Sequence, residues 1–547
     1  MHDHDLPTIH RSSQSGTRAR VGGGSPRSFG LIGGVAILAG GGGAGILGAA
    51  LLSSPSAATA TTWIVDSLGD GVGTAAHCTP PTAGTCTLRD ALAAQASGDT
   101  IAFDASLNGG TINLTAAQGQ LLVDHKAVTI TGPGADLLTI NQTVSNNPVF
   151  YIVAYEYNVV ISGLKITGGT DSGIAAYGVT DLTLDDVELT GNTAVKGGGL
   201  YLDLIYGDLS ITNSYIHGNT STGEGGGIYV PATASRVPGP GDVLISGTII
   251  SNNDSGARGG GGILRNSESV TIEDSTFSGN DSSNGGGALY IFSDADPVVI
   301  TGSTFDSNTA FYQGGAILAS TANLTINNST FTANTGMGGG GLSALHGSSL
   351  TVNQSTFTGN TATGADNDYF GGGGINFRGT VSVSMSGTIV SANSAAVAGQ
   401  ADIGFVDDGR VTTGTINSTN SLLGDIDSRI TLLGSGNIRS SAPGLGVLAA
   451  NGGPTRTMAL LLGSPAIDAG PDPVAVFVGN QFDQRGIGYP RIVGATADIG
   501  AFEFVPEPEP TTTSTSTTST SSTSSTAPAT TVTTVSTDDL VLPQFTG

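Results

Sequence analysis

A short pattern of apolar and polar positions returns many times along the middle of this chain. Residues 270–280 have the sequence VTIEDSTFSGN, residues 298–308 have VVITGSTFDSN, and residues 324–334 have LTINNSTFTAN. In each block apolar residues alternate with polar ones, a phenylalanine follows, and an asparagine ends the block. Glycines and another alternating segment come next, as in GGGALYI at residues 285–291. Alternation with a period of two predicts β-strands, and the glycines between them predict turns.

The asparagines that end these blocks give the repeat its length. Successive copies are separated by 26 to 34 residues, and most spacings are close to 27. Three short strands in a unit of this length predict the coils of a parallel β-helix, each stacked on the one before. Leucine-rich repeats would need a helical segment in every unit, and propeller blades would need about 40 residues or more. The asparagines are Asn192, Asn219, Asn253, Asn280, Asn308, Asn334, Asn360 and Asn393.

Each repeated letter has a predicted place in the coil. Isoleucine and phenylalanine would point into the bore and stack on the same residue one coil away. Asparagine tolerates a left-handed backbone at a corner, and its amide can bond to the asparagines above and below. One coil cannot bury enough apolar surface to be stable alone, so stacking and end caps are required. We therefore predict an all-β, single-stranded parallel β-helix of about 10–12 coils, capped at both ends.

Two of the repeats resemble a known family. FSGN at 277–280 with GGAL at 286–289, and FDSN at 305–308 with GGAI at 314–317, resemble the paired motifs of polymorphic outer membrane protein repeats. The resemblance covers about residues 180–395. It implies the right-handed, pectin lyase-like β-helix that those repeats share with pectate lyases.

The two flanks of the repeats carry further resemblances. Residues 86–115, which begin CTLRDALAAQ, resemble the CSLREA-type N-terminal segment of bacterial surface β-helix proteins. Within them, residues 88–96 predict a short amphipathic helix that covers the first coil. NGGPTRTMALLLGSPAIDAG at 451–470, DQRG at 483–486 and DIGAFE at 498–503 resemble the C-terminal part of the choice-of-anchor Q family. That resemblance implies an exported protein.

The chain divides into five predicted segments. Arginines, the apolar residues 29–52 and a small-x-small sequence at 58–60 predict an export signal, with an uncleaved N-terminal anchor as the alternative. Cys78 and Cys86 are the two cysteines, and their spacing in an exported protein predicts a disulfide. The segments are a signal peptide or anchor (1–60), an N-terminal cap with the disulfide and the short helix (61–125), the β-helix repeats (126–400), the last coils with a C-terminal cap (401–505), and a disordered Pro/Thr/Ser stalk that ends in the degenerate LPxTG-like sequence LPQFTG (506–547).

The charge balance is strongly acidic, with 18 basic and 43 acidic side chains and a formal net charge of −25. Such a surface repels nucleic acid and anionic lipid headgroups, so neither is an expected partner. It would also repel an acidic polysaccharide such as pectate unless calcium bridged the two. We predict no cofactor. Calcium is considered only as the ion that would bridge the chain to an acidic polysaccharide. The export signal and the disulfide predict a secreted or cell-surface protein, and we expect a monomer.

Few residues are candidates for catalysis. Asp185 and Asp186 are adjacent, but the next coil has a threonine and an asparagine in their place, and no basic residue joins them. They are therefore predicted to be solvated turn residues. A charged group near the C-terminus is interpreted as an internal Arg–carboxylate pair that holds the cap, and it consists of Asp483, Arg485, Asp498 and Glu503. We predict no catalytic residue and no metal ligand.

Tyrosine recurs at one outward position of the strand after the glycines. Tyr201, Tyr229 and Tyr290 would line one face, and flat amphipathic rings at coil spacing suit the faces of sugars. The alternative is that the stacked rings only stiffen the sheet. A row of opposite charges is predicted at the corner beside this face. The outward positions are Tyr201, Tyr229, Leu264, Tyr290, Leu318, Ser343 and Asn376, and the corner positions are Lys196, Glu224, Arg258, Asn284 and Gln313.

These observations predict an exported, non-catalytic surface protein that displays or binds ligands as an adhesin does. The expected partner is an extracellular polysaccharide or a cell-surface glycan, and the termini could attach the protein to a membrane or cell wall. The first alternative is a polysaccharide lyase or glycoside hydrolase with its site on a loop insertion, at 231–242 or at 361–370, where Asp366 and Asp368 fall. The second alternative is a structural stalk without a ligand.

Overall fold

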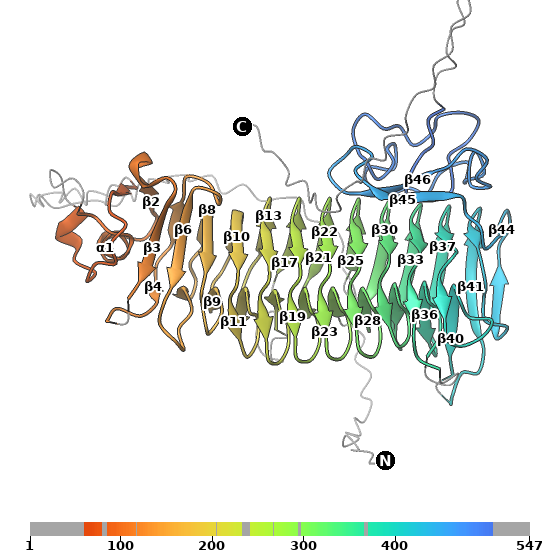
Figure 1. Cartoon of the computed structure of the whole chain (residues 1–547), viewed down its shortest axis with the longest axis horizontal. Helices are drawn as coiled ribbons and strands as arrows, with labels where there is room; N and C mark the ends of the chain where they lie inside the picture. Colours follow the sequence, from red (N-terminus) through yellow and green to blue (C-terminus); the bar gives the residue numbers. More distant parts are fainter. Residues whose placement is uncertain are drawn as a thin grey trace, which may run out of the picture. The chain divides into compact units, whose positions relative to one another are not determined.

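The computed structural model describes residues 60–506 apart from 79–84, 116, 204, 232–240, 266, 294–296, 366–369 and 408. The described chain winds into an elongated parallel β-helix, with coil stacked on coil along one axis (Figure 1). Each coil of the repeat contributes four short strands, and equivalent strands of successive coils pair in parallel register. The predicted all-β architecture of about 10–12 coils is confirmed, because the fourth row of strands has eleven members.

A 25-stranded sheet holds the first two strands of each coil. Two long strands, β8 (Val159–Thr167) and β10 (Leu182–Thr190), run through both of its rows. The remaining first-row strands are β1 (Thr62–Val65), β2 (Asp99–Phe103), β5 (Val128–Thr131), β13 (Leu209–Thr212), β17 (Asp242–Ser246), β21 (Ser269–Glu273), β25 (Pro297–Thr301), β29 (Asn323–Asn327), β33 (Ser349–Asn353), β37 (Ser382–Ser386), β41 (Gly414–Thr419) and β43 (Ile430–Leu433). The remaining second-row strands are β3 (Gly110–Leu114), β6 (Leu138–Gln142), β14 (Tyr215–His217), β18 (Ile249–Ser251), β22 (Thr276–Ser278), β26 (Thr304–Asp306), β30 (Thr330–Thr332), β34 (Thr356–Thr358), β38 (Ile389–Val390), β42 (Leu422–Leu423) and β44 (Ile438–Arg439).

Two further sheets complete the coil. The third row is an eight-stranded sheet of two-residue strands: β11 (Thr193–Ala194), β15 (Thr220–Ser221), β19 (Asp254–Ser255), β23 (Asp281–Ser282), β27 (Thr309–Ala310), β31 (Thr335–Gly336), β35 (Thr361–Ala362) and β39 (Ser394–Ala395). The fourth row, which we call the fourth sheet, consists of β4 (Leu121–Asp124), β7 (Phe150–Val153), β9 (Ile174–Tyr177), β12 (Leu200–Asp203), β16 (Ile228–Tyr229), β20 (Gly262–Arg265), β24 (Leu289–Phe292), β28 (Ile317–Ser320), β32 (Leu342–Ala344), β36 (Ile375–Arg378) and β40 (Ile403–Val406).

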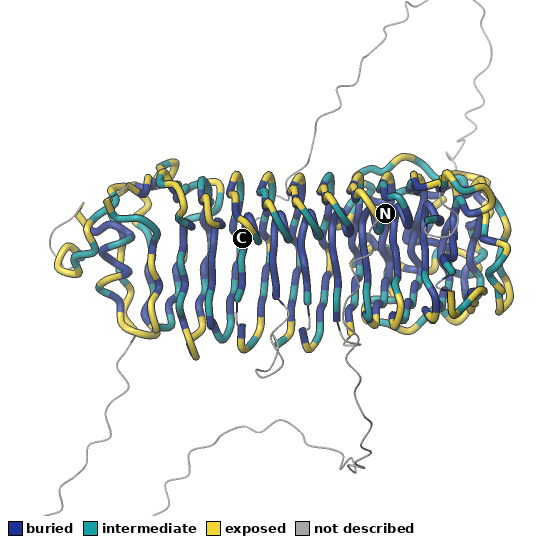
Figure 2. Tube along the Cα trace, turned by 90° about the horizontal axis from the view of Figure 1, so that it is seen from below, coloured by how far each residue is buried: buried dark blue, intermediate teal, exposed yellow. Residues whose placement is uncertain are grey.

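The bore of the helix is filled by the inward side chains of every coil. Figure 2 shows the strands mainly as buried chain and the corners between them as exposed chain. Phe277, Phe305, Phe331 and Phe357 are fully buried and stack face to face on successive coils. Their ring centroids are 4.8, 4.5 and 4.3 Å apart. Offset or parallel stacking at this distance adds to the burial of apolar area, so the column stabilises neighbouring coils together.

The repeated asparagines form one continuous ladder inside the corner, as the repeat predicts. From Asn192 to Asn360, each Nδ2 donates to Oδ1 of the asparagine in the next coil at 2.8 to 3.0 Å. The same Oδ1 atoms accept the backbone N–H of the preceding asparagine. The ladder begins where Asn192 accepts the backbone N–H of Gly169 and ends where Asn393 donates to the carboxylate of Asp402. Both polar atoms of each asparagine side chain in the ladder therefore have hydrogen-bond partners, although these side chains are buried.

The first coil is covered by a short helix. α1 (Leu88–Ala94) starts after Thr87, whose side chain and that of Asp90 form a reciprocal capping box. Leu88 and Leu92 are buried in the same core as the first strands. Cys78 ends the 3₁₀ helix η1 (Ala75–Cys78) and is bonded to Cys86, while a second 3₁₀ helix, η2 (Ala105–Leu107), follows β2. Neither α1 nor the two 3₁₀ helices has the length and apolar character needed to cross a membrane.

Beyond β44 the chain turns back along the side of the rod. We call residues 440–506 the flank segment, and it contains one antiparallel hairpin, β45 (Leu445–Ala449) and β46 (Thr457–Leu460). The segment lies against the outer face of the second row (Figure 1), where Thr330 Oγ1 donates to Gln484 at 2.6 Å. Its apolar side chains cover Ile389 and Leu422, which point outward from that row. The region predicted as a C-terminal cap thus packs against the flank of the coils.

Candidate functional site

Tyrosines gather on the outer face of the fourth sheet. Tyr151, Tyr177, Tyr201 and Tyr229 make successive ring contacts, with centroids 5.2, 5.6 and 5.5 Å apart. Three of them lie on β7, β9 and β12, where strand alternation buries one residue in the bore and turns the next outward. We call Tyr151, Tyr177 and Tyr201 the tyrosine face. Its three rings are partly exposed.

A cavity of about 250 Å³ opens on the tyrosine face. Ala175 pairs with Tyr151 on one side and with Tyr201 on the other, so a methyl group stands where a third ring would fit. Tyr177, two residues further along β9, forms one wall. The lining residues are Asp171, Ser172, Ala175, Tyr177, Val195, Lys196 and Tyr201. The site therefore combines aromatic walls with a carboxylate, a hydroxyl and an ammonium group.

The phenols of this cavity are neutral hydrogen-bonding groups. Burial raises the pKa of Tyr177 to about 12, and the neighbouring Tyr151 and the carboxylates of Asp171 and Asp203 act in the same direction. Burial also raises the pKa of Tyr201, with Asp203 as the next cause. Both hydroxyl groups stay protonated at neutral pH and can each donate and accept a hydrogen bond.

The three tyrosines predicted as a ligand site differ in their surroundings. Tyr201 lines the cavity, whereas Tyr229 and Tyr290 are only 5% and 8% exposed. Lys196 and Arg265 donate to the hydroxyl of Tyr229, so cations cover that ring. Tyr201 therefore offers a partly exposed ring, whereas Tyr229 and Tyr290 are covered, and the ligand-binding role of the three tyrosines stays a prediction.

The predicted outward series also contains one register error. Gly262 occupies the inward position that pairs with Leu289, so Ile263 points outward and pairs with Tyr290. Leu264 instead lies in the central core. The cause is that Gly262 takes the inward position that an apolar residue such as Ile228 or Leu289 occupies in the neighbouring coils, so the first apolar residue after the glycines points outward here. Sequence reasoning did not include Tyr151 and Tyr177, and the available signal was a tyrosine in each of the segments FYIV at 150–153 and IAAY at 174–177.

A cluster of cations borders the cavity at the predicted charged corner. Lys196, Glu224 and Arg258 stand on successive coils, and Arg265 joins them from β20. Arg265 donates to both oxygens of Glu224, at 2.6 and 3.1 Å. Lys196 and Arg258 lie farther from that carboxylate, at 3.8 and 4.0 Å. We call these four residues the basic patch, because three cations surround one carboxylate.

A second ionisable group lies on the 25-stranded sheet, and sequence reasoning did not find it. Glu188 accepts hydrogen bonds from Lys165 at 2.7 Å and from His217 at 2.9 Å. The ring of Tyr215 stacks on His217 with centroids 3.8 Å apart. Burial would raise the pKa of Glu188, but its bonds to His217 and Lys165 outweigh burial and lower it. Glu188 thus bonds to side chains of the preceding and the following coil, so this group links three coils.

The adjacent aspartates considered for catalysis, Asp185 and Asp186, have different surroundings. Asp185 accepts from Thr212 and Asn213 in the next coil, and Asp186 has a positive φ within β10, where the strand passes from the first row to the second. Asp366 and Asp368, and most of the insertion at 231–242, lie outside the described residues. Within the part of the chain that the structure describes, no group of three His, Cys, Asp or Glu side chains is placed to hold a metal ion.

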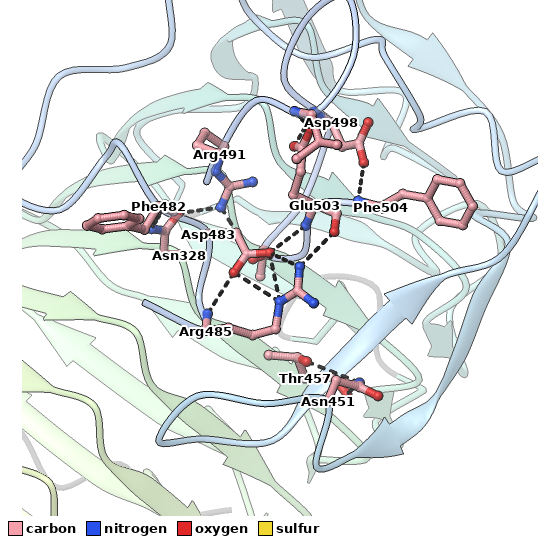
Figure 3. Close-up of polar contacts among 12 residues, drawn as sticks. Asn328, Asn451, Thr457, Phe482, Asp483, Arg485, Arg491, Asp498, Glu503 and Phe504 are labelled. Atoms are coloured by element: carbon pink, nitrogen blue, oxygen red, sulfur yellow. Dashed lines mark hydrogen bonds and ion pairs between the residues drawn. The ribbon is translucent and has the colours of Figure 1, made fainter. Parts of the chain in front are cut away.

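The charged group near the C-terminus is buried inside the flank segment (Figure 3). Arg485 forms an ion pair with Asp483 at 2.6 Å and stacks on the ring of Phe502. Arg491, which sequence reasoning did not include, is fully buried and donates to Asn328 of the rod at 2.7 Å. Glu503 accepts two backbone N–H groups of its own segment, and its burial raises its pKa to about 7. These contacts have the structural role predicted for an internal Arg–carboxylate pair.

Two family models match parts of the sequence. The model described as the right handed beta helix region matches residues 225–362. The Chlamydia polymorphic membrane protein repeat matches residues 213–231. The predicted right-handed, pectin lyase-like β-helix is thereby confirmed, as is the resemblance to polymorphic membrane protein repeats. The resemblances to the CSLREA-type segment and to the choice-of-anchor Q family stay predictions.

Solved structures of similar shape share little sequence with this chain. Tailspike protein 3 of bacteriophage CBA120 is 12% identical with a TM-score of 0.39, and the match covers 64% of this chain and 57% of the tailspike chain. Pectate lyase Pel9A is 13% identical with a TM-score of 0.36, over 81% and 96% of the two chains. A mannuronic acid specific family 6 lyase from human gut microbiota is 9% identical with a TM-score of 0.21, over 63% and 78%. No curated protein matches the sequence.

Proposed function

We propose that this protein is an exported, non-catalytic rod at the cell surface that binds a glycan through the tyrosine face. The observation that carries the proposal is the cavity above Ala175, which is walled by Tyr177 and Tyr201. Its volume of about 250 Å³ lies just below that of pockets for drug-sized ligands, which start at about 300 Å³. That size suits one or two sugar units of a longer chain that extends over the sheet.

The chemistry of the lining supports a sugar as the ligand. The protonated phenols of Tyr177 and Tyr201 can bond to sugar hydroxyls in either direction. Asp171 adds an exposed carboxylate that accepts hydrogen bonds. The apolar parts of the rings match the C–H faces of a pyranose.

Export is supported by the arginine-flanked apolar segment at residues 29–52 and by the disulfide, which forms in oxidising compartments. We place the rod at the cell surface, attached through one of its termini.

A glycan array tests the proposal. The full chain should bind at least one polysaccharide, and Tyr177→Ser together with Tyr201→Ser should weaken that binding at least tenfold, since truncating an aromatic anchor of a binding surface costs about 2 kcal/mol or more. Tyr312→Ser is the matched control, because Tyr312 is an exposed tyrosine away from the cavity. Thermal melts followed by circular dichroism check that each variant folds. Absence of binding by the parent chain, or equal binding by the double variant, would overturn the proposal.

The same panel separates binding from catalysis. Incubation of each bound polysaccharide with the protein, with and without calcium, should release no new ends. Unsaturated or reducing sugar ends would replace the binding proposal with the lyase or hydrolase alternative.

A further inference from the structure

We infer that the glycan carries a carboxylate, as a uronic acid does, and that Lys196 and Arg258 of the basic patch bind it. This inference rests on the proposed function of the tyrosine face and adds the class of sugar. It was not expected from the total charge, since a chain of net charge −25 should repel acidic polymers.

The basic patch holds more positive charge than its own carboxylate can balance. Arg265 makes a bidentate pair with Glu224, and this geometry uses both carboxylate oxygens. Lys196 and Arg258 are left at 3.8 and 4.0 Å, beyond hydrogen-bonding distance of Glu224. A network that served only to stabilise the corner would need one cation for this glutamate. The patch therefore carries two cations in excess, in a chain with more than twice as many acidic as basic side chains.

The two excess cations are exposed and held in place. The side chains of Lys196 and Arg258 are each 42% exposed. Lys196 Nζ donates to the hydroxyl of Tyr229 at 3.1 Å and lies 4.7 Å from the centre of its ring. The guanidinium of Arg258 lies 5.1 Å from the ring of Tyr290. Cation–π contacts of this kind fix a cation without neutralising it, so the charge remains available to a ligand.

The basic patch adjoins the cavity. Lys196 belongs to both, since it lines the cavity and flanks Glu224. Arg258 follows two coils later, which is about 10 Å along the rod at the usual strand spacing. A polysaccharide that enters the cavity and runs along the fourth sheet would thus pass Lys196 first and Arg258 next. The burial of Tyr229 and Tyr290 fits this arrangement, because their rings support the cations that meet the ligand.

The acidity of the remaining surface does not prevent such binding. At physiological ionic strength charges are screened beyond about 8 Å, so carboxylates farther away than this have little effect on a bound sugar. Asp171 is the one carboxylate among the residues that line the cavity, and the patch sets two excess cations against it. The same screening makes the interaction dependent on salt. Arginine and lysine pairs with a carboxylate are also stronger than neutral hydrogen bonds.

Paired ligands test the inference. Each uronate-containing oligosaccharide that binds is compared with its carboxyl-reduced counterpart, which has the same stereochemistry without the charge. We expect the acidic form to bind about tenfold more tightly, or about 1.4 kcal/mol. Lys196→Gln with Arg258→Gln should remove this preference, so that the acidic and the reduced form bind equally. Raising the sodium chloride concentration should weaken only the acidic form.

Lys165→Gln is the matched control, because it removes one positive charge from the 25-stranded sheet instead of the fourth sheet. It should leave the preference for the acidic form unchanged. Equal affinity for both forms, or a preference that survives in the Lys196 and Arg258 variant, would overturn the inference while the proposed function stands. If the parent chain binds neither form nor any other glycan, the proposed function fails as well.

Discussion

The asparagine ladder offers the sharpest test of how the coils are held together, and Asn308→Ala is the perturbation that we develop. Oδ1 of Asn308 accepts from the backbone N–H and from Nδ2 of Asn280, at 3.1 and 2.9 Å. Its Nδ2 donates to the carbonyl of Phe277 and to Asn334, both at 2.9 Å. Alanine removes all four bonds in a corner that is fully buried.

The expected cost follows from these four bonds. Each contributes about 1 kcal/mol net, and a buried N–H left without an acceptor costs about 1 to 3 kcal/mol. Asn280 would keep its bond to the carbonyl of Ile250 but lose the acceptor of its backbone N–H. We therefore expect Asn308→Ala to lower the local free energy of unfolding by about 4 kcal/mol.

Hydrogen exchange followed by mass spectrometry is the assay, together with urea unfolding monitored by circular dichroism. Local exchange matters because coils of a repeat protein can open without unfolding the rest. Peptides that contain Asn280, Asn308 and Asn334 should exchange faster, and peptides of the first coils should not. Asn158→Ala is the control, since Asn158 is an exposed turn residue. A loss below about 1 kcal/mol, or a loss equal to that of the control, would refute the reasoning.

Three further predictions concern the two ends of the described chain. Reduction of the Cys78–Cys86 disulfide opens a loop with a sequence separation of 8 residues and should destabilise the N-terminal cap by about 2 kcal/mol, seen as a lower melting temperature in dithiothreitol; an unchanged melt would contradict this. Glu503 has a pKa of about 7 in the folded chain against 4.5 unfolded, so its contribution to stability is fully present below about pH 4.5 and is lost as pH rises through 7. The flank segment should therefore exchange more slowly at pH 6 than at pH 8, after correction for intrinsic rates, and the opposite order would count against it. Gln484→Ala removes the bonds to the second row and should expose the segment to limited proteolysis, whereas Gln481→Ala, at an exposed position, should not.

The architecture could be predicted from the sequence because each coil repeats the same short sequence pattern. The alternating apolar positions, the phenylalanine and the asparagine recur at nearly constant spacing, so one interpretation explains eight copies at once. The capping helix was also visible, since Thr87 and Asp90 form a local signal of helix start. The path of the flank segment was not, because its contacts with the rod join residues about 150 positions apart, as in the bond between Thr330 and Gln484. A repeat pattern among neighbouring residues does not reveal such a long-range contact.

The candidate site was predicted in part for a similar reason. Tyr201 and the charged corner of Lys196, Glu224 and Arg258 followed from the repeat, because register fixes which side chains share a face. The cavity did not follow, since it depends on the absence of a ring at Ala175 and on the diagonal position of Tyr177. The order of apolar and polar residues in the sequence likewise does not show that a neighbour in the next coil buries a side chain.

The direction of the asparagine ladder makes the length of this rod adjustable. From Asn192 to Asn360 each amide donates to the asparagine of the next coil, so the ladder has one acceptor end, where Asn192 meets Gly169, and one donor end, where Asn393 meets Asp402. If a whole coil were inserted between these ends, its asparagine would accept from the preceding coil and donate to the following one. No buried group would be left unpaired. Length can therefore change in steps of about 4.8 Å while both terminators stay as they are. The number of coils, rather than any single residue, sets how far the tyrosine face stands from Asp402.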